Sequence, residues 1–475
     1  MILNLVRTLS TYIVPLITFP YVSHVLSASD LGRVDFSNSI VSNFLVLASF
    51  GTSAYGIRIV GQLRNDKSQL SKASQELFVL NAIFSMAATV GLSIFVMIDH
   101  KTQSNWAIFF LLAIPLFFNS MQMEWLYQGL EEYLYITKRT VVLQMISLVL
   151  VFVLVRRQGD AVPYAVTIAA NQMFVIIANI LGVKNRVNLK FVYKLELKKH
   201  IKGAFVIFLA LLSGTIFQKL ENILIGYLMN FQAVGFYYVA NKIVLILSSV
   251  VIGVGLTFLP TIVEEFNSGR IERVREILQN TINFSMLIVV PVCLGLIVLS
   301  KEIIIFIAGQ KYLSVEFSMQ VMTLLVPLVS ISVIYGNQVV LAAKKEKYSV
   351  IATIVGGSVG ITSNLLLIPV LGVFGAALSV VISSTVSTVI LYLVAYRYCK
   401  INLINISLMK FIFSSLLMAG AIEFGKSILD LNLFLWVLVG AVIYLGNLIL
   451  FKDKTLKYGF SLVWRLVSRG GKMPA

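Results

Sequence analysis

Charged residues are scarce in this chain. Asp, Glu, Lys and Arg make up 12% of its 475 residues, about half of the ~25% found in soluble domains. Two cysteines and three histidines, far apart in sequence, give no disulfide framework and no metal-binding pattern. The phosphate-binding loop of ATPases, the zinc-protease motif HExxH and the hydrolase motif GxSxG are all absent. We therefore predict no catalytic residues, no metal, no cofactor and no ATP hydrolysis within the chain.

Long apolar runs take the place of the missing charge. Hydrophobic residues make up 58% of the sequence, and runs of about 20 recur from end to end, which is the spacing of transmembrane helices. The runs are continuous rather than alternating, which excludes the strands of a membrane barrel. The sequence predicts an all-α polytopic membrane protein with about 14 spans, near 5–26, 36–58, 77–98, 106–126, 138–155, 162–182, 203–228, 235–259, 281–299, 318–342, 349–368, 374–396, 411–430 and 433–451.

The net charge of +17 is unevenly placed among the loops. If the N-terminus is inside, the even-numbered loops and the tail hold most of the Lys and Arg, and the outer loops hold few. This bias predicts a multi-pass membrane protein with both termini in the cytoplasm, where basic loops face anionic lipid headgroups. A nucleic-acid partner is excluded, because no soluble basic domain carries the charge.

A short internal repeat suggests two lobes. Residues 30–41 (DLGRVDFSNSIV) align with 233–244 (AVGFYYVANKIV), so that Gly32 matches Gly235. Repeated halves around a central site are common in transporters. The basic, amphipathic stretch 183–202 lies where a connector between lobes is expected. We predict a six-helix lobe at 1–182, a cytoplasmic connector at 183–202, a six-helix lobe at 203–397, and two extra helices with a basic tail at 398–475.

Three charges lie inside apolar segments where lipid-buried helices normally carry none. Lys219 and Glu221 lie within 203–228, and Lys242 lies within 235–259. A charge in a bilayer costs at least ~3 kcal/mol and usually faces a polar interior. Glu221 and Lys242 are predicted at matching depth, roughly 10 Å from the outer ends of adjacent helices. They form either an ion pair that only joins two helices or part of a charged cavity wall, in which Glu221 and Lys242 are a candidate coupling site. Lys242, and Lys219 on another helix face, are the candidate contacts for an anionic headgroup.

Two arginines are further candidates. Arg7 and Arg58 lie near the predicted cytoplasmic ends of the first two spans. Guanidinium groups match phosphate oxygens in bidentate geometry, so both arginines are candidate phosphate contacts. The alternative is that each extends to the membrane interface. Glu124 and Trp125 occupy a similar level, where Trp usually anchors a helix at the interface.

Several motifs give the chain a family resemblance. They are PLITFPYVSHVL (15–26), DLGRVDF (30–36), ASFGTSAYGIR (48–58), EWLYQGLEEYLYITKR (124–139) and LENILIGYL with VGFYYVANKI (220–243). With these motifs the chain resembles the bacterial O-antigen and capsule repeat-unit flippases of the multidrug/oligosaccharidyl-lipid/polysaccharide exporter superfamily. The sequence departs from the family at His24, where Arg is usual, and at Asn222, where Lys is usual.

The resemblance implies two six-helix bundles around a central cation-lined cavity, plus two peripheral helices. It implies alternating access, in which a polyprenyl-pyrophosphate-linked oligosaccharide is turned from the cytoplasmic to the outer leaflet for surface polysaccharide biosynthesis. Expected partners are that substrate, membrane lipids, a polysaccharide polymerase and glycosyltransferases. The alternatives are a lipid II flippase, a drug/cation antiporter, or, from another class, a membrane-embedded polymerase or ligase. The cavity lysines favour an anionic substrate over a drug cation, and the short outer loops disfavour a polymerase.

Overall fold

A computed structural model describes residues 2–184, 186–188, 195–256, 259–401, 405–453 and 455–456; the side chains of 2–13, 210–218, 249–260 and 337 lie outside that description. Helices account for the regular structure of the described residues, which confirms the predicted all-α class. The chain divides into two compact units, Met1–Tyr238 and Val239–Ala475, called here the first and second unit. The four sequence-based domain ranges stay a prediction.

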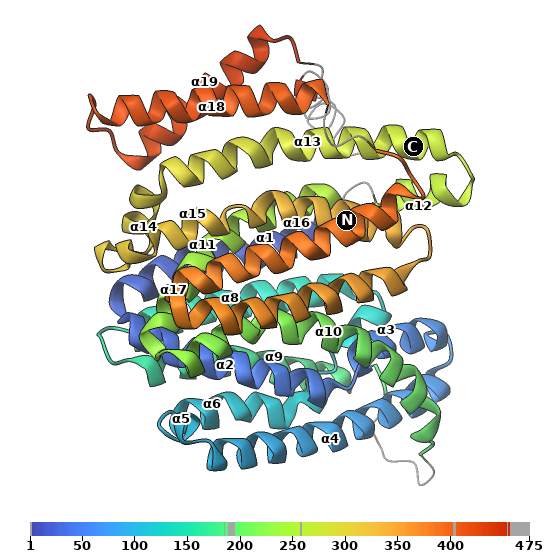
Figure 1. The fold of residues 1–475 in the computed structure, drawn as a ribbon. Coiled ribbons are helices and arrows are strands. Elements are labelled where there is room, and N and C mark those ends of the chain that lie inside the picture. The colour runs from blue at the N-terminus through green and yellow to red at the C-terminus, as the bar shows by residue number, and fades with distance from the viewer. Residues whose placement is uncertain are drawn as a thin grey trace. The chain divides into compact units, whose positions relative to one another are not determined.

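The first unit holds the helices up to the start of α11 (Figure 1). Within it, α2 packs on α4 and α10, α8 packs on α1 and α9, and α3 packs on α7. Its elements are α1 (Ile2–Val25), α2 (Ala28–Ser49), α3 (Thr52–Leu63), α4 (Lys67–Ile98), α5 (His100–Gln103), α6 (Trp106–Phe117), η1 (Phe118–Gln122), α7 (Glu124–Gly129), α8 (Tyr133–Leu154), α9 (Ala161–Val183), α10 (Lys198–Leu228) and the start of α11 (Phe231–Leu256).

In the second unit, α13 packs on α18, α18 packs on α19, and α17 packs on α15 and α16. Its further elements are α12 (Leu259–Asn267), α13 (Ile271–Val298), α14 (Ser300–Ala308), η2 (Gln310–Val315), α15 (Glu316–Met322), α16 (Leu325–Val333), η3 (Ile334–Val340), α17 (Glu346–Tyr396), α18 (Ile406–Lys426) and α19 (Leu433–Leu450). The longest of these, α17, departs from helical φ/ψ at Gly372, where two predicted spans meet.

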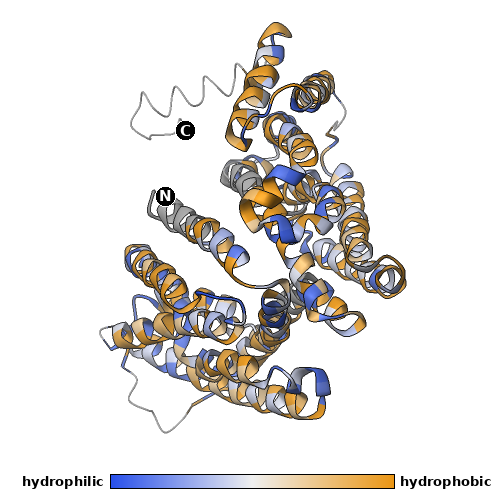
Figure 2. Cartoon of the chain, turned by 90° about the vertical axis from the view of Figure 1, so that its left-hand side faces the viewer, coloured by the Kyte–Doolittle hydropathy of each residue, from blue (hydrophilic) through white to orange (hydrophobic). Residues whose placement is uncertain are grey.

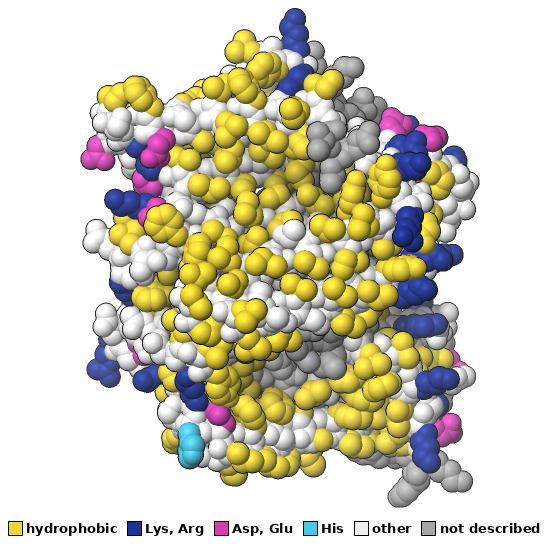
Figure 3. Space-filling model, viewed as in Figure 1, with side chains coloured by type: hydrophobic (Ala, Val, Ile, Leu, Met, Phe, Trp, Pro, Cys, Tyr) yellow, Lys and Arg dark blue, Asp and Glu magenta, His cyan; other side chains and the backbone are white. Residues whose placement is uncertain are grey.

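Eleven helices of the described residues are long and apolar enough to cross a membrane, with α17 counted once. The chain is therefore a multi-pass membrane protein, and the number 14 stays a prediction. Figure 2 views many of the helices close to end-on, and most of the helical ribbon in it is hydrophobic, with hydrophilic residues in short patches between. In Figure 3 the face shown has hydrophobic side chains over the middles of the helices and charged side chains at their ends.

Two predicted spans are interrupted. The span at 36–58 is divided between α2 and α3, because Phe50 and Gly51 adopt left-handed backbone conformations with φ of 43° and 72°. A Cβ on Gly51 would come within 2.3 Å of the Ala204 carbonyl oxygen on α10, so the close approach itself requires glycine. The span at 106–126 ends as an α-helix at Phe117, two residues after Pro115, and continues as η1.

The two glycines matched by the internal repeat lie in reciprocal contact within the first unit. A Cβ on Gly32 of α2 would lie 1.6 Å from the carbonyl oxygen of Phe231, and one on Gly235 of α11 would lie 1.8 Å from that of Ala28. Phe231 and Ala28 are the first residues of α11 and α2. Each glycine therefore lies against the first turn of the other helix, so the two positions that the repeat aligns occupy equivalent places in this contact.

Candidate functional site

The polar residues predicted on the seventh span lie on α10. Glu221 and Asn222 are buried, with 8% and 5% of their surface exposed, and Lys219 is half-buried. The Asn222 side-chain amide donates a hydrogen bond of 3.2 Å to the Ser39 hydroxyl on α2. The α2–α10 contact thus buries polar groups inside an apolar helix pair.

The other predicted residues are not brought together within either unit. Lys242 is half-buried on α11 in the second unit, whereas Glu221 belongs to the first. The Glu221–Lys242 pair accordingly stays a prediction. Arg58 is exposed on α3, and the side chain of Arg7 on α1 lies outside the described residues.

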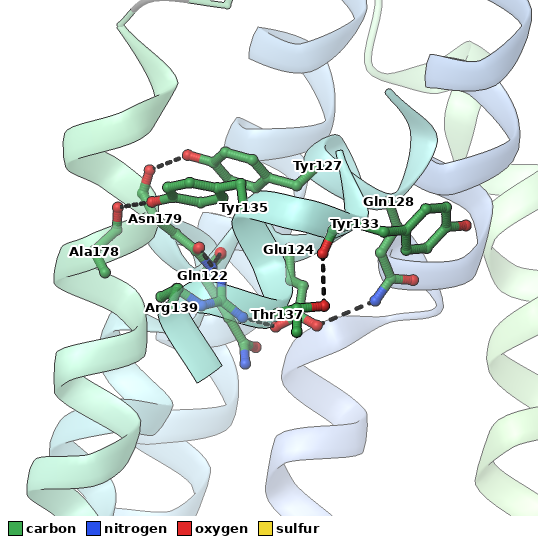
Figure 4. A network of polar contacts seen from close by, with 10 residues as sticks. All are labelled: Gln122, Glu124, Tyr127, Gln128, Tyr133, Tyr135, Thr137, Arg139, Ala178 and Asn179. Atoms are coloured by element: carbon green, nitrogen blue, oxygen red, sulfur yellow. Dashed lines mark hydrogen bonds and ion pairs between the residues drawn. The ribbon is translucent and has the colours of Figure 1, made fainter. Parts of the chain in front are cut away.

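A second polar cluster, centred on Glu124, was not predicted as a site (Figure 4). The Arg139 guanidinium on α8 lies 3.0 Å from a Glu124 carboxylate oxygen and also donates to the side-chain oxygen of Asn179 on α9. The Asn179 amide donates to the backbone oxygen of Gln122, and the Tyr127 hydroxyl donates to the backbone oxygen of Asn179. With only 6% of the Arg139 side chain exposed, the cluster joins η1, α7, α8 and α9 through buried charge.

An aromatic pair supports this cluster from one side. The rings of Tyr127 and Tyr135 stack with centroids 4.8 Å apart, and the Arg186 guanidinium lies 4.9 Å from each ring. Arg186 also donates to both carboxylate oxygens of Glu132, at 2.8 and 2.6 Å. These hydrogen bonds raise the pKa of Arg186 above its ordinary value. A cation held by a bidentate carboxylate and two rings fixes the turn between α7 and α8.

A cavity of about 240 Å³ adjoins Glu124. The Glu124 side chain is 26% exposed, and its carboxylate also accepts a hydrogen bond of 3.1 Å from the side-chain amide of Gln128. The cavity is lined by Ser53, Ile57, Asn81, Asn119, Gln122, Met123, Glu124, Trp125 and Gln128. An open cavity with this many polar side chains is suited to binding a polar ligand rather than a lipid chain.

A buried carboxylate, Glu76, holds the beginning of α10 against α4. One Glu76 oxygen lies 2.8 Å from the Lys199 ammonium and 2.9 Å from a His200 ring nitrogen. The other oxygen accepts a hydrogen bond of 2.9 Å from the Glu196 backbone amide. The Glu196 side-chain carboxylate pairs with the Lys72 ammonium at 2.9 Å, and this contact lowers the pKa of Glu196. Residues 196–200, near the C-terminal end of the predicted connector, are therefore attached to α4 in the first unit.

Replacing Glu76 with alanine should release this attachment. The Lys199 ammonium would lose its carboxylate partner, the His200 ring would lose a hydrogen-bond partner, and the Glu196 amide would lose its acceptor. We expect trypsin to cleave the folded protein several-fold faster between Lys198 and Lys202 than in the unchanged chain, measured by limited proteolysis and mass spectrometry. Glu131→Ala is the matched control, since the Arg64–Glu131 pair is exposed on both sides. Equal cleavage in the two variants would contradict the expectation.

The sequence matches a known family model over residues 1–266, which is described as "Polysaccharide biosynthesis protein". The chain belongs to the polysaccharide biosynthesis protein family. This result confirms the resemblance to polysaccharide flippases of the multidrug/oligosaccharidyl-lipid/polysaccharide exporter superfamily. Within the described residues of this family member, no three His, Cys, Asp or Glu side chains lie together as a candidate metal site.

Two curated relatives support the family assignment. A probable low-salt glycan biosynthesis flippase, Agl15, of Haloferax volcanii is 25% identical over 250 residues, covering 49% of this chain; the chain spans 50% of the length of that relative. A putative O-antigen transporter of Escherichia coli is 20% identical over 389 residues, covering 80% of this chain and 92% of the relative.

Solved structures share the fold. The lipid II flippase MurJ in an inward closed conformation is 13% identical, with a TM-score of 0.78, over 95% of this chain and 99% of its own. An inward-facing multidrug resistance transporter of the MATE family is also 13% identical, with a TM-score of 0.66, over 82% of this chain and 94% of its own. The TM-scores show a shared fold, and sequence identities of 13% do not show a shared substrate.

The sequence contains one signal for the Glu124 cluster. Trp125 is predicted to anchor a helix at the interface, but the structure buries Trp125 and pairs the neighbouring Glu124 with Arg139. The 124–139 segment was nevertheless one of the family motifs. Two opposite charges in one such motif, on either side of a short turn, indicate an ion pair across that turn.

Proposed function

We propose that this family member flips a polyprenyl-pyrophosphate-linked oligosaccharide repeat unit from the cytoplasmic to the outer leaflet of a bacterial cell membrane, for surface polysaccharide biosynthesis. The observation that carries the proposal is the buried polar surface of α10 within a member of the polysaccharide biosynthesis protein family. Names of the relatives, a flippase and a putative O-antigen transporter, support the same substrate class.

The charges define how such a substrate would be held. Lys219 and Lys242 supply cations within apolar helices, where a pyrophosphate would otherwise be costly to accommodate. Glu221 would balance one of these cations when the site is empty, and Arg7 and Arg58 would meet phosphate at the cytoplasmic entrance. The Lys- and Arg-rich loops support a cytoplasmic position of both termini under this proposal. A polysaccharide polymerase and glycosyltransferases would act beside it.

A lipid II flippase is the second candidate. The high structural similarity to MurJ favours it over a drug antiporter, and a Bacillus subtilis lipid II flippase is 26% identical over 141 residues. Both candidates carry a polyprenyl pyrophosphate, so they differ in the sugar. Complementation of strains that lack either flippase separates them: restoration of surface polysaccharide supports the proposal, and restoration of peptidoglycan synthesis supports the second candidate.

Lys219→Ala and Lys242→Ala test the role of the charges. Each variant should slow export about tenfold, which corresponds to ~1.4 kcal/mol of lost substrate binding, because the pyrophosphate loses a cation. The measurements are surface polysaccharide and the lipid-linked precursor left in the cytoplasmic leaflet. Lys67→Ala, at an exposed position at the start of α4, is the control and should export normally. Normal export by both test variants would contradict the proposed role.

A further inference from the structure

The cavity beside Glu124 is polar in a part of the molecule made of apolar helices. Its walls come from α3, α4, η1 and α7, all within the first unit. Polar side chains at membrane level are normally satisfied by the protein or face water. Here several of them remain open: Ser53 and Gln122 are exposed, and Glu124 is partly exposed. The cavity is therefore a hydrated site.

Charge excludes a phosphate as the occupant. None of the nine residues that line the cavity is Lys, Arg or His, and one, Glu124, is an anion. A phosphate would meet this carboxylate without a compensating cation on the cavity wall. Arg139, which lies behind Glu124, already forms an ion pair with it. The same pairing disfavours a metal or organic cation, because the negative charge of Glu124 is already neutralised.

The remaining chemistry suits a neutral group with many hydroxyls. The side-chain amides of Gln122, Asn119 and Gln128 offer donors and acceptors to a ligand, whereas the Asn81 oxygen already accepts hydrogen bonds from Ser85 and Asn119. Within the described part of the chain, the Gln122 side-chain amide has no hydrogen-bond partner on another side chain. The network in Figure 4 uses only the backbone oxygen of Gln122. The Glu124 carboxylate has about four lone-pair directions, and two are used by Arg139 and Gln128. Acceptors for sugar hydroxyls therefore remain.

Size and rigidity agree with a sugar. At about 30 Å³ per water, 240 Å³ corresponds to about eight water molecules, comparable with a single sugar residue. The Asn81 side chain is fixed by three hydrogen bonds, to Thr52, Ser85 and Asn119, at 2.7 to 3.1 Å. The stacked tyrosines and Arg186 hold α7, the helix that begins at Glu124, against α8. A site with fixed polar groups discriminates between hydroxyl patterns.

We propose that this cavity binds one neutral sugar residue of the transported oligosaccharide and contributes to the choice of repeat unit. The inference rests on the proposed function, and it adds the part of the substrate that the first unit recognises. The lysines of α10 and α11 would take the charged pyrophosphate, and the Glu124 cavity a neutral sugar. Gln122 and Glu124 are then specificity-determining residues.

Protection of an introduced cysteine tests the site directly. Both natural cysteines are buried, so Ser53→Cys in the full chain gives an accessible thiol at the cavity. We expect at least one free monosaccharide among glucose, galactose, rhamnose and N-acetylglucosamine to slow its reaction with a charged thiol reagent threefold or more. A polyethylene glycol too large for the cavity, at matched viscosity, is the viscosity control, and Lys67→Cys, on exposed surface, should not be protected. Adding Gln122→Ala to Ser53→Cys should abolish the protection.

Other outcomes overturn the inference. Protection by pyrophosphate or sodium ions but by none of the four sugars would assign the cavity to an ion. No protection by any probe, in a protein whose Ser53→Cys thiol reacts readily, would remove the sugar site. Neither result depends on export, so a chain that exports polysaccharide without sugar protection refutes this inference alone. A chain that shows protection but restores no export refutes only the proposed function.

Discussion

Arg139→Ala is expected to lower the free energy of unfolding by about 3 kcal/mol, the lower end of the range for breaking a buried ion pair. The substitution leaves Glu124 without its cation and Asn179 without a donor, in a network that joins α7, α8 and α9. We take the lower end because the Glu124 side chain is 26% exposed, so water can solvate part of the remaining charge. Thermal or denaturant unfolding of the purified chain in detergent measures the loss.

Arg157→Ala is the matched control. The Arg157 side chain is 86% exposed, and its pair with Asp160 spans 3.6 Å at the surface, so removal should change stability by less than about 1 kcal/mol. Removing both partners of the buried pair, in Arg139→Met with Glu124→Gln, should recover much of the loss, because no uncompensated charge remains. Equal stability of Arg139→Ala and Arg157→Ala would show that the Glu124 cluster is not a structural ion pair.

Gly32→Ala is expected to destabilise the first unit by about 3 kcal/mol, the upper end of the range for overpacking. The added methyl would lie 1.6 Å from the Phe231 carbonyl oxygen, which is a backbone atom and cannot move to another rotamer. Helices α2 and α11 would have to separate at their first turns. The expected result is a large drop in melting temperature and a loss of folded protein after purification.

Gly420→Ala is the control for Gly32→Ala. Gly420 lies inside α18, and a Cβ there would meet no atom within 4 Å. Alanine at such a position should be neutral or stabilise the helix by up to about 1 kcal/mol. Gly235→Ala should resemble Gly32→Ala, because its methyl would lie 1.8 Å from the Ala28 carbonyl. Wild-type melting temperatures in both α2 and α11 variants would contradict the close contact.

The sequence was sufficient for the helical class and for the family, because both depend on residues close together in the chain. Apolar runs of about 20 residues identify spans without reference to neighbours. Helix breaks were harder to predict. The division between α2 and α3 depends on the left-handed conformations of Phe50 and Gly51, which allow a close approach to α10. That contact joins residues about 150 positions apart and has no local signature.

The candidate site residues were likewise predictable from the sequence only where their signal is local. Lys219 and Glu221 were identifiable because charge in an apolar run is conspicuous. The Glu124 cavity was not, since its polar side chains come from α3, α4, η1 and α7 and appear singly in the sequence. In the sequence Arg139 stands beside Lys138 and carries no sign of its own role. Only its 3.0 Å contact with Glu124 distinguishes it. Packing between helices, rather than pattern within one helix, makes this site.

The reciprocal contact between the starts of α2 and α11 also constrains how mutations can be compensated. Each missing methyl group would meet a carbonyl of the opposite helix, and neither glycine fills space vacated by the other. No replacement at Gly235 can therefore suppress a defect caused by replacement of Gly32. Selection for revertants should recover glycine itself, or changes elsewhere that move the α11 backbone. Because separating the two helices for one replacement also relieves the clash of the other, Gly32→Ala and Gly235→Ala together should destabilise the chain by less than the sum of their separate effects.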